Sequence, residues 1–184
     1  ATSYGTGQLI AAALARGVRT IIVGMGGSTA SDGGAGMAQA LGARLFDSRS
    51  IDLGLGAAPL RTLARVEARE LKKKIKGARF IAVSDVTNPL IGALGSARIY
   101  GPQKGATPSI VHHLEICLKR YAHVLKKDLG RDVARLPGTG AAGGLGAGLV
   151  AFLGAEIVPG ASWVLREIKA KPILARADAA LTGE

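Results

Sequence analysis

Short apolar runs rich in β-branched residues are spaced along the chain and predict buried strands. The clearest are Thr20–Val23 and Phe80–Val83, which are too short for helices and end abruptly at glycine or polar residues. Further strands are expected at Ala43–Asp47, Ala155–Val158 and Ala177–Leu181. Because the chain is 48% apolar and contains 27 glycines, these runs fit a buried parallel sheet. We therefore predict an α/β fold with a layered, mainly parallel sheet and flanking helices.

Helical periodicity appears between these runs. The clearest helix is expected to be capped by Thr107, to begin at Pro108 and to run to Lys127, before Gly130. Its apolar positions share one face: 110, 111, 114, 117, 118, 121, 124 and 125. Shorter helices are expected around residues 9–14, 35–41, 149–153 and 161–169, and Lys171-Pro172 should break the last of them.

Positive charge dominates the composition without forming a nucleic-acid-binding pattern. The 184 residues carry a net charge of +11, but Lys and Arg are scattered apart from Lys72–Lys76, and no aromatic residues are interleaved among them. That run belongs to a charged amphipathic segment, Leu60–Lys76, whose lysines should face water and whose Leu63, Val66 and Leu71 should point inward. Small anionic substrates explain the positive charge equally well, so no nucleic-acid partner is expected.

The lone cysteine, Cys117, rules out a disulfide within this sequence and a metal site built from cysteines. Its place on the apolar face of a helix favours a core position. No apolar run is long enough to span a bilayer, and no signal-peptide pattern is present. We therefore expect a cytoplasmic location and no membrane partner.

The stretch Thr20–Gly42 organises the rest of the chain. A predicted strand runs into the loop Gly24–Thr29, whose glycines permit positive φ and whose hydroxyls can donate to an anion. Asp32 suits the N-cap of the following helix, Ala35–Leu41. Such a turn directs free backbone N–H groups and the helix dipole at one spot, which favours a phosphate or a carboxylate. The alternative is a glycine turn that serves only tight packing between strand and helix.

Two later loops carry candidate chemistry. Asp85 directly follows the strand Phe80–Val83, and ligands of parallel sheets collect beyond the carboxyl ends of strands. Equally, Asp85 could hold the turn that leads to Asn88-Pro89. Lys104, which stands beside Gly105 and just before a helix, is suitably placed to neutralise a phosphate. The expected strand Ala177–Leu181 would bring Glu184 to the same rim.

Six short motifs, rich in glycine and hydroxyl-bearing residues, occur in order along the chain. They are Thr2-Ser3-Tyr4-Gly5-Thr6-Gly7, Gly26-Gly27-Ser28 with Asp32-Gly33-Gly34-Ala35-Gly36-Met37, Asp85-Val86-Thr87-Asn88-Pro89-Leu90, Tyr100-Gly101-Pro102-Gln103-Lys104-Gly105-Ala106, Pro137 to Gly146, and Leu181-Thr182-Gly183-Glu184. In this order they resemble the bacterial type I glycerate kinase family. The resemblance covers essentially the whole chain, and six ordered motifs are far more specific than any one of them.

The resemblance implies a two-domain α/β kinase that transfers the γ-phosphoryl group of ATP, with Mg²⁺, to D-glycerate and gives chiefly 2-phosphoglycerate. The chain resembles the middle of that family, because the family's N-terminal Asp-Ser-Phe-Lys-Gly-Ser segment and the Gly-Arg-Ile-Asp continuation after Thr-Gly-Glu do not occur in it. Residues 1–184 are therefore expected to be a central portion, truncated at both ends, that comprises most of one α/β domain and segments leading to the second. Ser84 departs from the family's usual Cys.

The resemblance also implies roles for residues of this chain. The substrate- or phosphate-binding set is Gly24, Gly26, Gly27, Ser28, Thr29, Asp32, Asn88 and Gly105. Lys104 would offset charge that builds on the transferred group, and Asp85 or Glu184 would hold Mg²⁺ or accept the proton of the attacking hydroxyl. Two other classes stay open: a non-catalytic nucleotide- or metabolite-binding module, and a basic nucleic-acid-binding protein. The oligomeric state is left open.

Overall fold

A three-stranded parallel sheet lies at the centre of the fold. The computed structural model describes residues 1–179 and 181. Its sheet contains β1 (Thr20–Gly24), β4 (Arg79–Val83) and β5 (Glu156–Val158) in the order β1-β4-β5. Thr20 is paired with Arg79, and Ile81 with Glu156. The predicted parallel sheet is confirmed, as are the strands expected near residues 20, 80 and 155.

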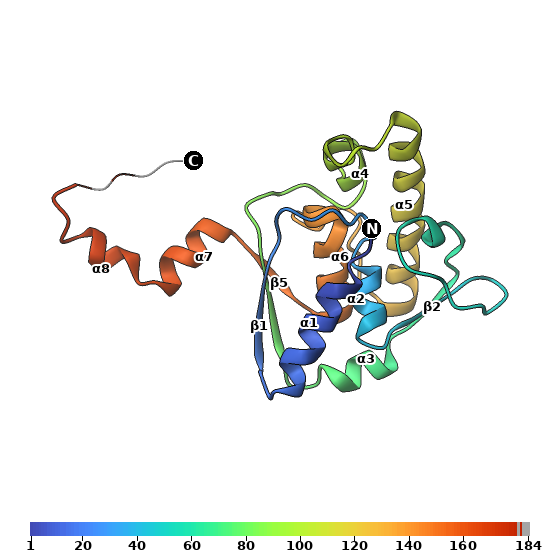
Figure 1. The fold of residues 1–184 in the computed structure, drawn as a ribbon, viewed down its shortest axis with the longest axis horizontal. Helices are drawn as coiled ribbons and strands as arrows, with labels where there is room; N and C mark the ends of the chain where they lie inside the picture. Colours follow the sequence, from blue (N-terminus) through green and yellow to red (C-terminus); the bar gives the residue numbers. More distant parts are fainter. Residues whose placement is uncertain (180, 182–184) are drawn as a thin grey trace.

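Helices pack on one side of this sheet, on the right of the body in Figure 1. They are α1 (Tyr4–Ala15), α2 (Ala35–Ala40), α4 (Ser96–Tyr100), α5 (Pro108–Leu129) and α6 (Ala141–Leu153). The strand side chains that face them, Phe80 and Ala82 among them, belong to the hydrophobic core. Ile22, on the alternate face of β1, is 46% exposed. The flanking helices that the sequence predicted are therefore present.

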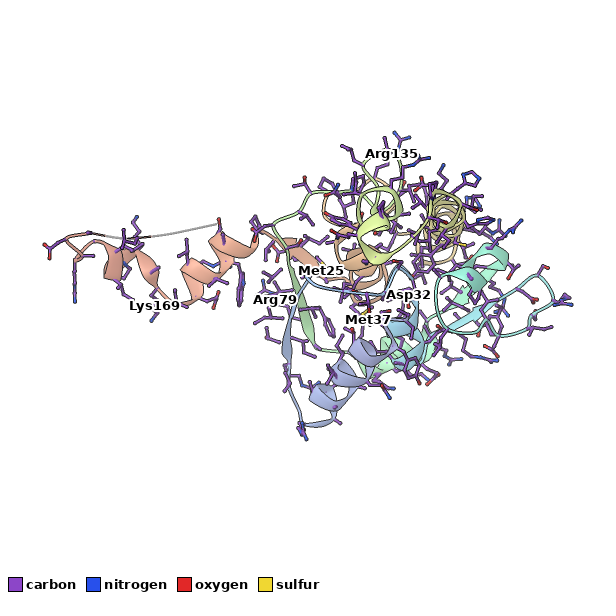
Figure 2. The ribbon with its side chains drawn as sticks, turned by 45° about the horizontal axis from the view of Figure 1, so that its top comes forward. Met25, Asp32, Met37, Arg79, Arg135 and Lys169 are labelled. Atoms are coloured by element: carbon purple, nitrogen blue, oxygen red, sulfur yellow. The ribbon has the colours of Figure 1, made fainter. Side chains whose placement is uncertain are left out.

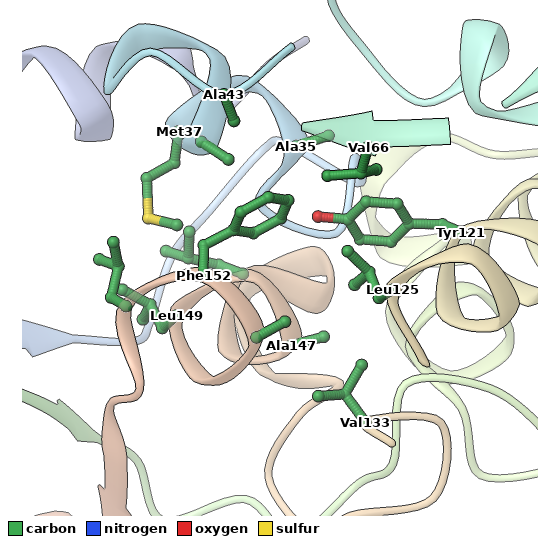
Figure 3. Packing of buried hydrophobic residues seen from close by; sticks show 14 of the residues in the cluster. Ala35, Met37, Ala43, Val66, Tyr121, Leu125, Val133, Ala147, Leu149 and Phe152 are labelled. Atoms are coloured by element: carbon green, nitrogen blue, oxygen red, sulfur yellow. The ribbon is translucent and has the colours of Figure 1, made fainter. Parts of the chain in front are cut away.

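The core is built mainly from α2, α5 and α6. Met37 of α2, Phe152 of α6 and Tyr121 of α5 meet in it (Figure 3). Cys117 is 3% exposed on α5 and belongs to the same core, as predicted. The ends of α5 also match the sequence, because Thr107 Oγ1 accepts a hydrogen bond from the Ile110 amide and Gly130 adopts a positive φ of 68°.

The charged segment after residue 57 forms three elements. These are the 3₁₀ helix η1 (Ala58–Thr62), β3 (Arg65–Glu67) and α3 (Arg69–Lys74). Leu63, Val66 and Leu71 are buried, as expected. The helical spacing of these three residues is nevertheless interrupted, because β3 pairs antiparallel with β2 (Arg44–Phe46). Pairing with a distant strand thus outweighs the local periodicity.

The C-terminal residues leave the body of the protein as an arm. The arm contains α7 (Gly160–Glu167) and α8 (Ala170–Leu174), and Figure 1 shows both extending away from the sheet. The break between them falls at Lys169, labelled in Figure 2, which has a φ of 54°. Pro172, the expected breaker, lies in the first turn of α8, where a missing N–H group is tolerated.

The strand predicted at Ala177–Leu181 is wrong for the described residues. Residues 177–179 and 181 have no strand conformation, and residue 180 lies outside the description. A strand requires a hydrogen-bonded neighbour, whereas α7 and α8 carry this segment away from the sheet (Figure 1). Among the helices of residues 1–179, none combines the length and apolar character that crossing a bilayer requires.

Two glycines of α1 lie in opposite environments. A Cβ atom on Gly7 would overlap the Met37 carbonyl and lie 2.7 Å from the Ala40 Cβ, so α1 can approach α2 only because residue 7 has no side chain. A Cβ atom on Gly5 would meet nothing within 4 Å. Close packing between α1 and α2 therefore depends on Gly7 and not on Gly5.

We expect Gly7→Ala to lower the free energy of unfolding by about 1–3 kcal/mol, because overpacking forces the helices apart. Gly5→Ala, the matched control, should raise it by about 0.5–1 kcal/mol, since alanine favours helix without any new contact. Urea denaturation followed by circular dichroism measures both. Equal effects of the two substitutions would contradict the close packing of α1 on α2.

Candidate functional site

Four segments that are far apart in the sequence surround one small pocket. Its volume is about 150 Å³. We call it the central pocket, and its walls are Met25, Gly26, Gly27, Ser28, Val86, Tyr100, Gln103, Lys104, Ala142 and Gly143. The first four of these residues follow β1, and Val86 follows β4. Tyr100 ends α4, and Gln103 and Lys104 belong to the 3₁₀ helix η2 (Pro102–Lys104). Ala142 and Gly143 lie at the start of α6. The carboxyl ends of two parallel strands thus supply two of its walls, as expected for an α/β sheet.

The first glycine loop, which lines this pocket, contains backbone amides without a hydrogen-bond partner among the described residues. The Met25 amide donates to the Val83 carbonyl at 2.9 Å, which anchors the loop to the end of β4. Gly27 adopts a φ of 60°, and Ser28 Oγ accepts from the Ala30 amide at 3.2 Å. Within residues 1–179, the amides from Gly26 to Thr29 donate no hydrogen bond. These groups are therefore available to an anion.

The N-terminus of α2, by contrast, is already satisfied from within. Asp32 is 1% exposed, and its carboxylate accepts from the amides of Ser3, Gly34 and Gly36 and from the Thr2 hydroxyl, at 2.8–3.3 Å. Ser3 Oγ accepts from the Met37 amide at 2.9 Å.

The N-cap position of α2 is Gly34, not Asp32. The expectation that the α2 amides point at a ligand is therefore wrong, because the segment Thr2–Ser3 and Asp32 occupy them. Figure 2 labels Asp32 inside the body.

Lys104 reaches the glycine loop from the opposite wall. Its Nζ donates to the Ala30 carbonyl oxygen at 2.6 Å. Gly143, with a φ of 70°, makes room for this contact, since a Cβ atom there would overlap the Ala30 carbonyl and lie 3.0 Å from Lys104 Nζ. Partial burial lowers the pKa of Lys104, and the negative charge of Asp32 opposes that shift. The structure thus brings Lys104 and the loop Gly24–Thr29 together.

Asp85 lies beside the central pocket. Its neighbour Val86 lines the pocket, whereas Asp85 Oδ1 accepts from the Ala161 amide at 3.2 Å, in the first turn of α7. Residue 85 is exposed. Asp85 accepts a hydrogen bond from the first turn of α7, whose N-cap position is Pro159, and the sequence did not indicate this contact. Glu184 lies outside the described residues.

Asn88 and Gly105 are bound into the walls around the pocket. Asn88 Oδ1 accepts from the Tyr100 hydroxyl at 2.7 Å, and Asn88 Nδ2 donates to the Leu94 carbonyl at 2.9 Å. These bonds close the loop between β4 and α4. Gly105 follows Lys104 with a φ of 83° and lines a neighbouring cleft.

Tyr100, Gln103 and the start of α6 are site residues that sequence reasoning missed. Positive φ values of 51° at Ala142 and 70° at Gly143 let the start of α6 bend into the pocket wall. These residues lie in two of the six motifs, Tyr100–Ala106 and Pro137–Gly146, but the motifs do not show which segments meet or which side chains line a pocket.

Two larger clefts adjoin the central pocket. One, the α5 cleft, measures about 530 Å³ and lies between α5, the loop 55–59 and Lys104. The other, the α1 cleft, measures about 540 Å³ and lies between α1, β1 and the first glycine loop. Lys104 lines the α5 cleft and the central pocket but not the α1 cleft.

The comparisons with known proteins agree with one another. The whole chain, residues 1–184, matches the model of the glycerate kinase family. The glycerate kinase of Halalkalibacterium halodurans and the glycerate 2-kinase of Escherichia coli are each 45% identical over 183 residues, which cover 100% of this chain and 48% of each relative. A solved structure of a Salmonella typhimurium LT2 protein assigned as glycerate kinase 2 aligns with a TM-score of 0.90 and 48% identity, over 96% of this chain and 47% of that one. The chain thus spans about half the length of the relatives it matches.

We expect the Lys104 ammonium group to titrate below the ordinary lysine value of 10.5, because burial disfavours its charged form. NMR titration of ¹³C-labelled lysine side chains measures this pKa, and Lys104→Met assigns the signal by removing it. Added inorganic phosphate should raise the Lys104 pKa, since a bound anion favours the ammonium form. A midpoint at or above 10.5 without phosphate would contradict the half-buried position.

Proposed function

The chain belongs to the glycerate kinase family, and on this premise we propose that it is part of an enzyme that phosphorylates D-glycerate with ATP and Mg²⁺, to give 2-phosphoglycerate. One observation carries the proposal: a loop of unused backbone donors and the ammonium group of Lys104 face the same small pocket. Four segments converge there. Such convergence supports a site for negatively charged substrates.

Phosphoryl transfer requires alignment and positive charge more than covalent chemistry from the protein. The amides from Gly26 to Thr29 and the Ser28 hydroxyl would bind anionic oxygens of the substrates. Lys104 would offset the charge that builds on the transferred group, from a position that its bond to the Ala30 carbonyl fixes. Gly105 permits the turn after Lys104, and Asn88 holds the wall behind it.

The residues present are compatible with Mg²⁺ that is held mainly by substrate phosphates. Within residues 1–179, no three His, Cys, Asp or Glu side chains are grouped as a metal cage. Mg²⁺ commonly takes one or two carboxylates together with phosphate oxygens, and it would neutralise phosphate charge here. Asp85, exposed beside the pocket, would supply such a carboxylate or accept the proton of the attacking hydroxyl. Glu184 is the second candidate for either role.

The remaining parts of the proposal concern the whole protein. Residues 1–184 would form the central portion of a two-domain kinase that acts in the cytoplasm, without nucleic-acid or membrane partners. Because the chain spans about half the length of its relatives, activity is best measured on a full-length protein that contains it. A non-catalytic binding module would bind ATP or D-glycerate in that form without making phosphoglycerate.

Lys104→Ala should reduce kcat for D-glycerate phosphorylation by about 10²–10³-fold, because one preorganised donor to the transition state is lost. The measurement couples phosphoglycerate formation to downstream glycolytic enzymes. Lys72→Ala is the matched control, since Lys72 is an exposed cation of α3 outside the pocket. Near-normal turnover by Lys104→Ala would remove Lys104 from the proposed chemistry.

Asp85→Asn separates the two roles of Asp85. The side-chain oxygen of asparagine can still accept from the Ala161 amide, so the thermal unfolding midpoint should stay close to that of the parent protein. Turnover should fall about 10²-fold or more, because the amide neither accepts a proton nor binds Mg²⁺ as a carboxylate does. Unchanged turnover together with a loss of stability in Asp85→Ala would limit Asp85 to its structural contact with α7.

A further inference from the structure

Lys104 forms a wall shared by two compartments of very different size. The α5 cleft, about 530 Å³, lies on one side, and the central pocket, about 150 Å³, lies on the other. The residues of the first glycine loop and those just after it are divided between the same two compartments. Gly26, Gly27 and Ser28 line the central pocket, whereas Thr29 and Ser31 line the α5 cleft. Lys104 is thus the charged side chain that the two compartments share.

The lining of the α5 cleft combines polar and apolar residues. Thr29, Ser31 and Lys104 are the polar members that concern an anion. Ile110 of α5 and Leu55, which are 47% and 49% exposed, add apolar surface. A nucleoside triphosphate has the matching character, with a flat apolar base at one end and phosphates at the other.

The central pocket is smaller, and both polar and apolar residues line it. Its polar groups are the amides of the first glycine loop, the Ser28 and Tyr100 hydroxyls, the Gln103 amide and Lys104. A nucleotide would not fit into about 150 Å³, since pockets for ligands of that size span about 300–1,000 Å³. A short hydroxy acid would fit, and its carboxylate and hydroxyls would find donors and acceptors on the walls.

Charge distinguishes the α5 cleft from the equally large α1 cleft. Glycines, apolar side chains and five hydroxyl-bearing residues line the α1 cleft, and no charged side chain of residues 1–179 does so. The five are Thr2, Ser3, Thr6, Ser28 and Thr29. A triphosphate needs positive charge along its path. Of the two large clefts, only the α5 cleft offers Lys104, and only this cleft shares Lys104 with the central pocket.

We propose that the α5 cleft holds the base and ribose of the nucleoside triphosphate, that the central pocket holds the hydroxy acid, and that the phosphoryl group is transferred beside Lys104. This assignment rests on the proposed function. A bond forms between the acid's hydroxyl oxygen and the γ-phosphorus, while the bond from that phosphorus to the β,γ-bridging oxygen breaks. The hydroxyl proton goes to the carboxylate base, and the nucleoside diphosphate leaves from the α5 cleft.

Ile110→Glu tests the nucleotide side in the full-length protein. The new carboxylate would face the nucleotide, so the KM and the Kd for ATP should rise about tenfold or more through repulsion and lost apolar contact, while the KM for D-glycerate stays unchanged. The variant should fold, because Ile110 is half-exposed and an acidic residue suits the first turn of a helix. Ile116→Glu is the matched control on the same helix, 38% exposed and outside all three compartments.

Gln103→Glu tests the acid side. A carboxylate there should raise the KM for D-glycerate about tenfold by repelling the substrate carboxylate, while the Kd for ATP stays unchanged. Gln8→Glu, exposed on α1, is the control for a change in net charge. Thermal unfolding followed by circular dichroism checks that each variant is folded.

The outcomes separate the assignment from the function on which it rests. If the parent protein neither binds ATP nor forms phosphoglycerate, the proposed function fails and the assignment fails with it. If the parent protein is active but Ile110→Glu raises the KM for D-glycerate alone, or Ile116→Glu weakens ATP to the same extent, the assignment is overturned and the function stands. Opposite effects of Ile110→Glu and Gln103→Glu on the two substrates support it.

Discussion

The close approach of two backbone segments, residues 30–34 and the start of α6, determines the shape of the site. The Gly33 amide donates to the Gly143 carbonyl at 3.1 Å, and a Cβ atom on Gly148 would lie 2.7 Å from the Gly33 carbonyl oxygen. Side chains at these positions would separate the segments. Because the contact places the Ala30 carbonyl where Lys104 reaches it, the position of the cation depends on glycines that carry no chemistry themselves.

Charge compensation in the site follows from the same arrangement. Asp32 saturates the amides that would otherwise make the N-terminus of α2 an anion site, so the unused donors belong to the loop before it. The buried Asp32 carboxylate also favours the charged form of Lys104, which partial burial opposes. One buried aspartate thus occupies amides at the start of α2, ties them to the Thr2–Ser3 segment and favours the charged form of Lys104.

Much of this arrangement was predictable, because local patterns report local structure. The runs Thr20–Val23 and Phe80–Val83 form the parallel pair that places the first glycine loop and Asp85 at one edge of the sheet. Hydrogen bonds between residues that lie far apart in the sequence could not be predicted. The Ser3 hydroxyl accepts from an α2 amide, the Tyr100 hydroxyl donates to Asn88, and an α7 amide donates to Asp85. None of these contacts produces a periodic pattern in the sequence. The strand expected at Ala177–Leu181 fails for the same reason, since apolar composition does not specify a neighbour to pair with.

The bond between Asp85 and α7 joins the site to the C-terminal arm. Asp85 Oδ1 accepts from the Ala161 amide, and a Cβ atom on Gly160 would lie 2.6 Å from Asp85 Oδ2, so the first turn of α7 rests directly on the carboxylate. Lys104, by contrast, is fixed by the loop and α6 within the body. The candidate cation and the candidate carboxylate are therefore held by different parts of the chain. Asp85 itself follows β4, so the sheet positions its backbone while its side chain contacts the arm.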